Sequence, residues 1–363
     1  MGIRARIASG GRDYATLGLR PGHVQPFEDG MRTSGRAGTY EWWYFDARLS
    51  DGTKLVITFF TKPLVSPGRP LSPAVSVDLD LPDGGNIHRI ADYPAASFDA
   101  STDGCDVRIG PNTFRGDLHR YRIHVELEGI EADVVLTGTV PGWRPGTGYW
   151  FFGKRDEYYF AWLPAVPQGE AEVSMTVGGV RQHGSGTGYH DHNWGNRPVA
   201  KLIDHWYWGR GSAGGYSVVT AAVTAAKRYG SVQLPVFLLA KDGQIVADDG
   251  SKAAFAPSGF FQDPDTGKAV PSVIGFDYRD GAERYLVTYT RTSTVLAARL
   301  GSYLPRRARL AARLAGFSGA YFRFSGTLDV REFRDGRPAG AGQAPALWEL
   351  MRLGRSGQRH SRA

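Results

Sequence analysis

The chain has 363 residues, of which 42% are hydrophobic and 22% charged, and its formal net charge is +7. This composition excludes a disordered or fibrous chain, and no stretch approaches the roughly 20 consecutive apolar residues that span a membrane as a helix. The basic excess is concentrated near the two ends and in residues 295–317. Because no nucleic-acid-reading motif accompanies it, we expect no nucleic-acid partner.

Cysteine content and the first residues bear on the cellular compartment. Cys105 is the single cysteine, so no disulfide can form within the chain. Arg4 and Arg6 are not followed by the apolar run of a secretion signal. We therefore expect a cytoplasmic protein.

The pattern of short apolar runs predicts β structure throughout. Residues 1–37 form a Gly- and Arg-rich leader, after which residues 40–49 and 54–61 read as a β-hairpin. Further strands are expected at 74–81, 105–109, 120–127, 132–140, 157–162 and 171–177. Short strands at regular spacing without helices between them predict an antiparallel sandwich or barrel.

A second β unit of similar size is expected, since the chain is longer than one hydrophobic core usually supports. Its strands are predicted at 205–209, 216–226, 232–240, 259–262, 275–278, 283–291, 321–334 and 345–353. Residues 295–317 differ, because apolar residues recur there at helical spacing and predict a helix interrupted at Pro305. This basic segment is expected either to cover the barrel or to contact an anionic membrane.

Polar and aromatic side chains concentrate in the segment GTGYHDHNWG, residues 186–195. In an extended strand, alternation places Tyr189, Asp191 and Asn193 on one face. The same alternation places His190 and His192 on the other face.

The face with Asp191 has the composition of an acid site. A carboxyl that aromatic neighbours desolvate has a raised pKa and can act as a general acid, with Tyr189 and Asn193 orienting it. Alternatively, Asp191 and Asn193 satisfy backbone groups of the turn that begins at Gly195. We favour the catalytic interpretation of Asp191.

The face with the histidines raises the question of a metal. His190 and His192 at positions i and i+2, with His205 later, have the spacing by which strands present imidazoles to zinc. No third ligand has motif-like spacing, and clustered histidines commonly stack on aromatic rings or bond to backbone. We therefore expect no metal and no other cofactor.

Three aromatic segments are expected to bind an apolar substrate. The first, residues 40–46, places Glu41 and Trp43 on a shared face, and Glu41 would be costly to bury unpaired. The second contains Phe160 and Trp162. The third, residues 205–210, contains His205 and Trp208.

Four motifs of the chain resemble the AttH-like family, which includes the bacterial carotenoid 1,2-hydratases, also called hydroxyneurosporene synthases. They are YEWWYFD (40–46), GTGYHDHNWG (186–195), HWYWGR (205–210) and ALWELMRLG (346–354). The resemblance implies two consecutive lipocalin-like β-barrels or sandwiches with a hydrophobic ligand site. The corresponding domains are residues 38–198 and 199–354, followed by a basic tail at 355–363.

The resemblance also implies a chemistry. In the hydratases, water adds to an isoprenoid double bond without a cofactor, and the motif aspartate donates the proton with support from a tyrosine and a tryptophan. Carried over, these residues are Asp191, Tyr189 and Trp162. Phe160 and His192 depart from the hydratase pattern, and DHNWG is closer to the wider AttH-like members, whose fungal relatives include Diels-Alder cyclases.

The sequence thus predicts a cofactor-free enzyme that holds a hydrophobic isoprenoid or polyene and hydrates or cyclises it with Asp191 as the acid. Two alternatives remain open. One is a pericyclase that acts by shape alone, and the other is a non-catalytic carrier of apolar molecules.

Overall fold

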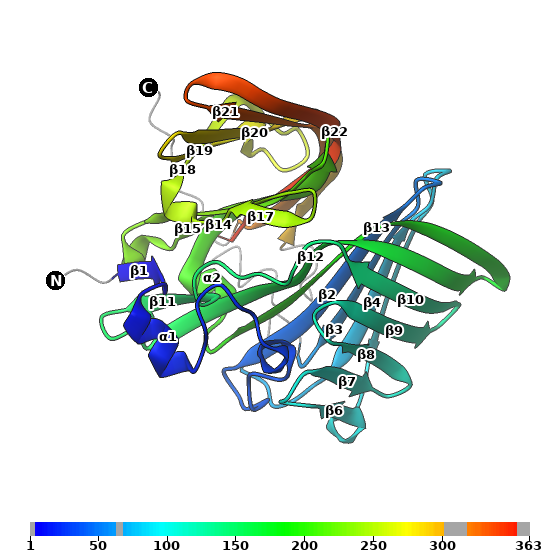
Figure 1. Cartoon of the computed structure of the whole chain (residues 1–363). Helices are drawn as coiled ribbons and strands as arrows, with labels where there is room; N and C mark the ends of the chain where they lie inside the picture. Colours follow the sequence, from blue (N-terminus) through cyan, green and yellow to red (C-terminus); the bar gives the residue numbers. More distant parts are fainter. Residues whose placement is uncertain (1–3, 63–67, 301–317, 354–363) are drawn as a thin grey trace. The chain divides into compact units, whose positions relative to one another are not determined.

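The computed structural model describes residues 4–62, 68–300 and 318–353, and strands account for most of them (Figure 1). The chain divides into two compact units. One runs from Arg6 to Pro198, and the other begins at Val199 and also includes Arg4 and Ala5. Each unit is built on one antiparallel sheet, so the expected all-β, lipocalin-like fold is confirmed.

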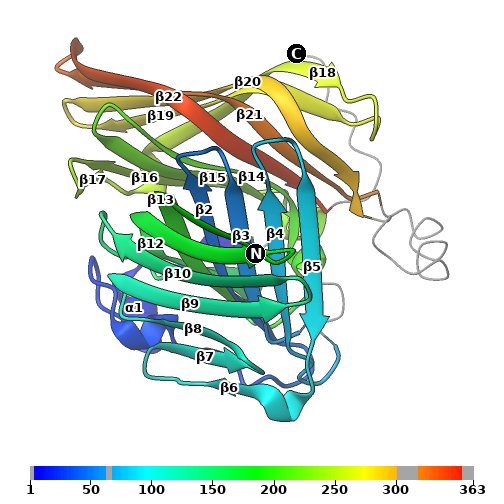
Figure 2. The ribbon, with the colours of Figure 1, turned by 90° about the vertical axis from the view of Figure 1, so that its right-hand side faces the viewer.

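The sheet of the first unit follows the order β5-β4-β3-β2-β13-β12-β10-β9-β8-β7-β6, while β11 pairs with β12 and β1. The sheet curls around its own core (Figures 1 and 2), and the ring of Phe59 on β3 meets that of Phe114 on β8 edge to face at 5.6 Å. The strands are β1 (Arg4–Ile7), β2 (Tyr40–Leu49), β3 (Lys54–Phe60), β4 (Ala74–Asp80), β5 (Asn86–Asp92), β6 (Phe98–Ala100), β7 (Cys105–Ile109), β8 (Asn112–Gly116), β9 (Arg120–Leu127), β10 (Ile130–Gly138), β11 (Tyr149–Gly153), β12 (Tyr158–Val177) and β13 (Val180–Gly195).

Alternation along β2 explains how the core forms. Trp43, Phe45 and Ala47 are buried in the core cluster, whereas Trp42 and Tyr44, which alternate with them, are half-buried on the opposite face. A period of two gives the sheet one face against the core and a second face with its own side chains. Both faces of β2 matter for the site described below.

Two long strands, β12 and β13, pair along most of their length and position the central motif. The expected strands at 157–162 and 171–177 are one strand, because β-bulges beside Pro164 and Pro167 let the pairing continue. β13 also pairs with β2 from Gly186 to Gly195. A Cβ atom at Gly186 would lie 2.0 Å from the carbonyl oxygen of Arg48 on β2, so the first motif glycine permits this close pairing.

The leader is part of the first unit's structure. It contains helix α1 (Gly11–Leu17) and the 3-10 helix η1 (Pro26–Asp29), and a further 3-10 turn, η2 (Ala95–Ser97), follows later in the unit. Glu28 and Asp29 at the end of η1 are buried. The side chain of Glu28 is paired with Arg144 at 2.6 Å between Oε2 and Nε, which ties the leader to the segment before β11.

The sheet of the second unit follows the order β17-β16-β15-β14-β22-β21-β20-β19-β18. Its own apolar core is centred on Tyr289, Phe324 and Trp348. Its strands are β14 (Ile203–Ala213), β15 (Tyr216–Ala225), β16 (Gln233–Lys241), β17 (Gln244–Ala247), β18 (Ala253–Gln262), β19 (Ala269–Asp280), β20 (Glu283–Arg299), β21 (Ala320–Arg334) and β22 (Arg337–Arg352), and its short helices are α2 (Val199–Leu202), η3 (Lys227–Tyr229) and η4 (Gly250–Lys252).

The expected helix at 295–317 does not begin where its periodicity predicted. Val295 to Arg299 form the end of strand β20, where Leu296 pairs with Arg323 and Arg299 with Ala320 of β21. The backbone hydrogen bonds offered by β21 outweigh the helical spacing of these few side chains. Residues 301–317 lie outside the described residues. None of the helices within the described part of the chain is long and apolar enough to cross a membrane.

Candidate functional site

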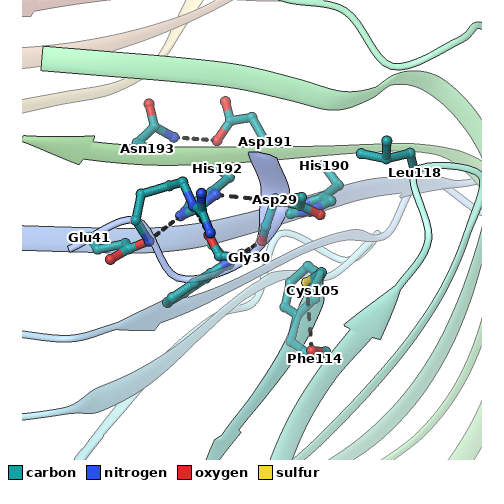
Figure 3. A network of polar contacts seen from close by, with 12 residues as sticks. Asp29, Gly30, Glu41, Cys105, Phe114, Leu118, His190, Asp191, His192 and Asn193 are labelled. Carbon is teal, nitrogen blue, oxygen red and sulfur yellow. Dashed lines mark hydrogen bonds and ion pairs between the residues drawn. The ribbon is translucent and has the colours of Figure 1, made fainter. Parts of the chain in front are cut away.

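The two faces of β13 carry two separate groups of side chains, as alternation predicted. Figure 3 shows Asp191 and Asn193 on one side of the strand and His190 and His192 on the other. In the register, Asp191 is opposite Tyr44 of β2, and Asn193 is opposite both Trp42 of β2 and Trp162 of β12. Directly opposed residues share a face, so these aromatic residues accompany Asp191.

Three side chains donate hydrogen bonds to the carboxyl group of Asp191. Oδ2 accepts from Nε1 of Trp162 at 2.7 Å and from the hydroxyl of Tyr189 at 2.8 Å. Oδ1 accepts from Nδ2 of Asn193 at 2.6 Å. Asp191 is therefore engaged by side chains of its own face, rather than by the turn backbone that was the alternative interpretation.

The environment of Asp191 favours its protonated form. The residue is only 8% exposed. Burial is the main cause that raises the pKa of Asp191 to about 6, and the hydrogen bonds from Trp162, Tyr189 and Asn193 and the charge of His190 oppose the rise. All three donors are neutral groups, so desolvation prevails over them.

Aromatic rings surround this acid. The indole of Trp162 lies 6.4 Å from Trp143 and 6.0 Å from Trp150 between ring centroids, and Trp150 stacks on Phe160 at 5.1 Å. Tyr44 meets Tyr189 edge to face at 6.2 Å. The structure thus brings four residues expected from the sequence together at the acid: Tyr189, Trp162, Asn193 and, through Trp150, Phe160.

The opposite face of β13 holds a buried network centred on Asp29. Nε2 of His190 lies 3.1 Å from Oδ2 of Asp29, which also accepts a 2.6 Å hydrogen bond from the hydroxyl of Tyr121. Nδ1 of His190 donates to the carbonyl oxygen of Tyr44 at 2.9 Å. His192 lies between two carboxylates, with Nε2 2.8 Å from Oε1 of Glu41 and Nδ1 3.5 Å from Oδ1 of Asp29.

Charge pairing sets the protonation of this network. Desolvation opposes charge on both Asp29 and His190. The positive charge of His190 and its hydrogen bond nevertheless lower the pKa of Asp29, and the negative charge of Asp29 and the same hydrogen bond raise the pKa of His190. The two groups form a buried ion pair. Sequence reasoning missed Asp29, because an acidic pair in a Gly- and Arg-rich leader carries no local signal of burial.

Glu41 and Trp43 belong to the network and not to the face that carries Asp191. Trp43 is fully buried and stacks on His192 at 4.6 Å with an interplanar angle of 13°. Glu41 accepts hydrogen bonds from the backbone nitrogens of Arg32 and Thr33 as well as facing His192. The expectation that Glu41 needs a partner when buried is met by these groups, and the sheet separates both residues from Asp191.

His205 and Trp208 lie on β14 of the second unit. Nδ1 of His205 is 2.7 Å from Oδ2 of Asp204, and Nε2 is 3.2 Å from the hydroxyl of Thr224. Trp208 is half-buried opposite Glu349 of β22. Their predicted contact with substrate stays a prediction.

Known proteins resemble this chain in sequence and in fold. Residues 96–261 match the family model of the carotenoid hydratase CrtC. The chain is 28% identical over 205 residues to a hydroxyneurosporene dehydrogenase of Chlorobaculum tepidum, an alignment that covers 48% of this chain and 53% of the relative. It is also 28% identical over 201 residues to the quinolone epoxide rearrangement protein asqO of Emericella nidulans, covering 50% of this chain and 53% of that protein. The chain thus spans about half the length of these curated relatives.

A solved structure extends the likeness to nearly the whole fold. The crystal structure of a putative AttH protein from Nitrosomonas europaea superposes with a TM-score of 0.58 at 20% identity, covering 92% of this chain and 98% of that chain. Fold and site together define a lipocalin-like β protein with a buried carboxylic acid among aromatic rings. The chain is similar to the carotenoid hydratase CrtC family over residues 96–261, and the resemblance expected from the motifs is confirmed.

Proposed function

We propose that this protein is an enzyme that protonates a carbon–carbon double bond of an apolar isoprenoid or polyene, with Asp191 as the general acid, and so hydrates it. The observation that carries the proposal is the carboxyl of Asp191, buried among aromatic rings with a pKa raised to about 6. Such a group is protonated at pH values far above those at which an ordinary aspartate ionises, and it can give up its proton in a transition state.

The hydrogen bonds indicate which oxygen of Asp191 carries the proton. A carboxyl group has about four lone-pair positions. Trp162 and Tyr189 occupy both positions on Oδ2, and Asn193 occupies one on Oδ1. The remaining position is on Oδ1, so we assign the transferable proton to Oδ1.

The reaction then follows in two steps. The proton moves from Oδ1 of Asp191 to one alkene carbon, and a carbocation develops at the other. Water adds its oxygen to the cationic carbon, and one of its protons returns to Asp191, so that the acid is regenerated. The electron-rich faces of neighbouring rings such as Trp162 stabilise the cation.

Trp162, Tyr189 and Asn193 position the acid in this scheme. Their three bonds fix the plane of the carboxyl and stabilise the carboxylate that remains after proton transfer. Phe160 and Trp150 supply the apolar surroundings that keep the acid protonated. His205 and Trp208 are proposed as further substrate contacts from the second unit.

The similarity to the CrtC family supports hydration, and the similarity to a quinolone epoxide rearrangement protein favours a second candidate. In that candidate, the same acid protonates an apolar substrate that then rearranges or cyclises without adding water. The chemistry at Asp191 is shared, and the fate of the cation differs.

Product analysis in heavy water tests the proposal. Apolar extracts and a panel of isoprenoids and polyenes are incubated with the protein in deuterium oxide and compared by mass spectrometry with samples containing Asp191→Asn. Hydration gives a product with one added water and carbon-bound deuterium, whereas rearrangement gives deuterated or isomeric product without added oxygen. Recovery of unchanged ligand bound to both proteins would instead identify a carrier and refute the acid mechanism.

A further inference from the structure

The core side of β13 contains a second cluster of reactive side chains that the proposed acid chemistry does not use. We propose that Asp29, Cys105 and His190 bind a divalent transition metal of the zinc class. The site lies across the sheet from Asp191 (Figure 3) and is independent of the proposed reaction.

The three ligand residues converge from distant parts of the chain. Asp29 ends η1, Cys105 begins β7 and His190 lies on β13, and all three are buried. Their ligand atoms lie within 4.8 Å of one another. The separation of 3.1 Å between Nε2 of His190 and Oδ2 of Asp29 is close to the edge of roughly 3.3 Å that follows from the bond lengths of a tetrahedral zinc site.

His190 has the hydrogen bond that metal-binding histidines usually have. Its Nδ1 donates to the carbonyl oxygen of Tyr44 at 2.9 Å, and a carbonyl can only accept. This bond fixes the ring so that Nε2 points toward Asp29, and its lone pair becomes a metal ligand once the proton shared with Asp29 is displaced. Rings of Phe114 and Tyr121 at 4.6 and 4.5 Å hold the imidazole on its sides.

His192 provides an independent sign that a cation belongs here. Its Nε2 donates to Oε1 of Glu41 at 2.8 Å, which leaves the other ring nitrogen, Nδ1, turned away from Glu41. That nitrogen faces Oδ1 of Asp29 at 3.5 Å, and neither atom has a hydrogen-bond partner among the described residues. Buried polar atoms that face each other without a hydrogen bond are costly, and a cation held beside Asp29 offsets that cost.

The donor set selects the class of metal. Thiolate and imidazole ligands suit zinc and its neighbours, whereas magnesium and calcium take oxygen ligands. Binding displaces the thiol proton of Cys105 and the proton between His190 and Asp29, and both are released to solvent. The charges of Cys105 and Asp29 then balance the ion, so the buried cluster is neutral.

Such an ion would act as a structural clamp. It would join η1 of the leader to β7 and β13, and therefore fix the back of the strand that carries Asp191. A bound metal stabilises the folded state in proportion to its affinity, because the unfolded chain does not present the site.

Cobalt uptake by the full-length protein tests the site without an activity assay. The wild type is treated with chelator, returned to metal-free buffer and titrated with Co²⁺ under reducing conditions. We expect one cobalt per chain with visible bands of tetrahedral geometry and a near-ultraviolet thiolate-to-cobalt band, together with a raised melting temperature. Absence of cobalt uptake, or uptake without the thiolate band, would overturn the proposal.

Variants assign the ligands. Cys105→Ser is expected to abolish the thiolate band and weaken binding, and His190→Gln is expected to abolish uptake. The matched control is His124→Gln, which removes the centre of the exposed group His124, Glu131 and Asp133 on the same unit. Loss of cobalt binding in the His124 variant, with retention in Cys105→Ser, would place the metal at the surface and refute the buried site. Circular dichroism verifies that each variant is folded.

Discussion

The two units close their sheets in the same way but hold very different acids. In each unit the last strand pairs with a strand from near the start of the same unit. These pairs are β13 with β2 in the first unit and β22 with β14 in the second. Each closing strand carries a carboxyl on the face away from its core cluster. In the first unit it is Asp191, and in the second it is Glu349.

The partners of these two carboxyls show what distinguishes an acid site from an ion pair. Within the part of the chain that the structure describes, the hydrogen bonds that Asp191 accepts come from neutral groups, including Tyr189 and Trp162. Glu349 accepts from the hydroxyl of Tyr321 and from Nε of Arg323 at 3.1 Å. Glu349 therefore has a cationic partner in Arg323, whereas desolvation of Asp191 among neutral donors favours its protonated form. The two carboxyls thus differ both in burial and in the charge of a neighbour.

The largest effect is expected when the acid of the first unit is removed. Asp191→Asn preserves the shape of the side chain but has no proton to donate, so turnover should fall by about 10²- to 10⁴-fold. Glu349→Gln is the matched change in the second unit and should leave the rate within a few-fold of wild type. Both rates are measured with the substrate identified by product analysis. Equal losses in the two variants would remove the distinction between the carboxyls.

The second effect concerns the leader of the first unit. Arg144 binds both oxygens of Glu28, at 2.6 and 3.2 Å, with both side chains almost fully buried. Desolvation even raises the pKa of Glu28 despite Arg144. Glu28→Gln leaves a buried guanidinium without its counterion, and the free energy of unfolding should fall by about 3 kcal/mol.

Urea unfolding followed by tryptophan fluorescence measures this loss. The control is Asp280→Asn in the second unit, where the partner of the exposed Lys252 is removed, and its unfolding midpoint should not change. A midpoint for Glu28→Gln equal to that of wild type would show that the leader is not held through this pair.

The pH dependence of the rate provides a third test. A pKa of about 6 for Asp191 means that the protonated form predominates below pH 6. As pH rises above this value, the rate of an acid-dependent step should fall by about tenfold per pH unit. The residual rate of Asp191→Asn should lack this limb, and a wild-type rate that rises with pH would exclude Asp191 as the acid.

Much of the first unit's site could be predicted from local patterns. The alternation of residues 186–195 separated Asp191 from His190 and His192, and the aromatic strands around Trp43 and Trp162 were recognised. Which aromatic residues share a face with Asp191 could be decided only from the strand register. The register places Trp43 and Glu41 on the opposite face of the sheet from Asp191. Asp29 could not be found, because its burial depends on a long-range return of the leader to β13 and not on its sequence neighbours.

The predicted helix at 295–317 shows where a local pattern led to a wrong prediction. Apolar spacing alone favoured a helix from Val295 onward, but pairing with β21 extends β20 to Arg299. Periodicity in a short segment is ambiguous when a partner strand is available. Long-range pairing decided the structure both there and at Asp29.

The smallest effect is expected at Tyr189, and it has a distinctive direction. The hydroxyl of Tyr189 donates to Oδ2 of Asp191 and so stabilises the carboxylate, which lowers the pKa of Asp191. Tyr189→Phe removes this bond while keeping the ring, so the pKa of Asp191 should rise. The pH above which the rate falls should therefore increase by up to about one unit, the equivalent of one hydrogen bond. Tyr321→Phe, which removes the matching bond to Glu349 in the second unit, should leave the profile in place. A downward shift in the Tyr189 variant would mean that Tyr189 stabilises the protonated acid, and the assignment of the proton to Oδ1 would then be wrong.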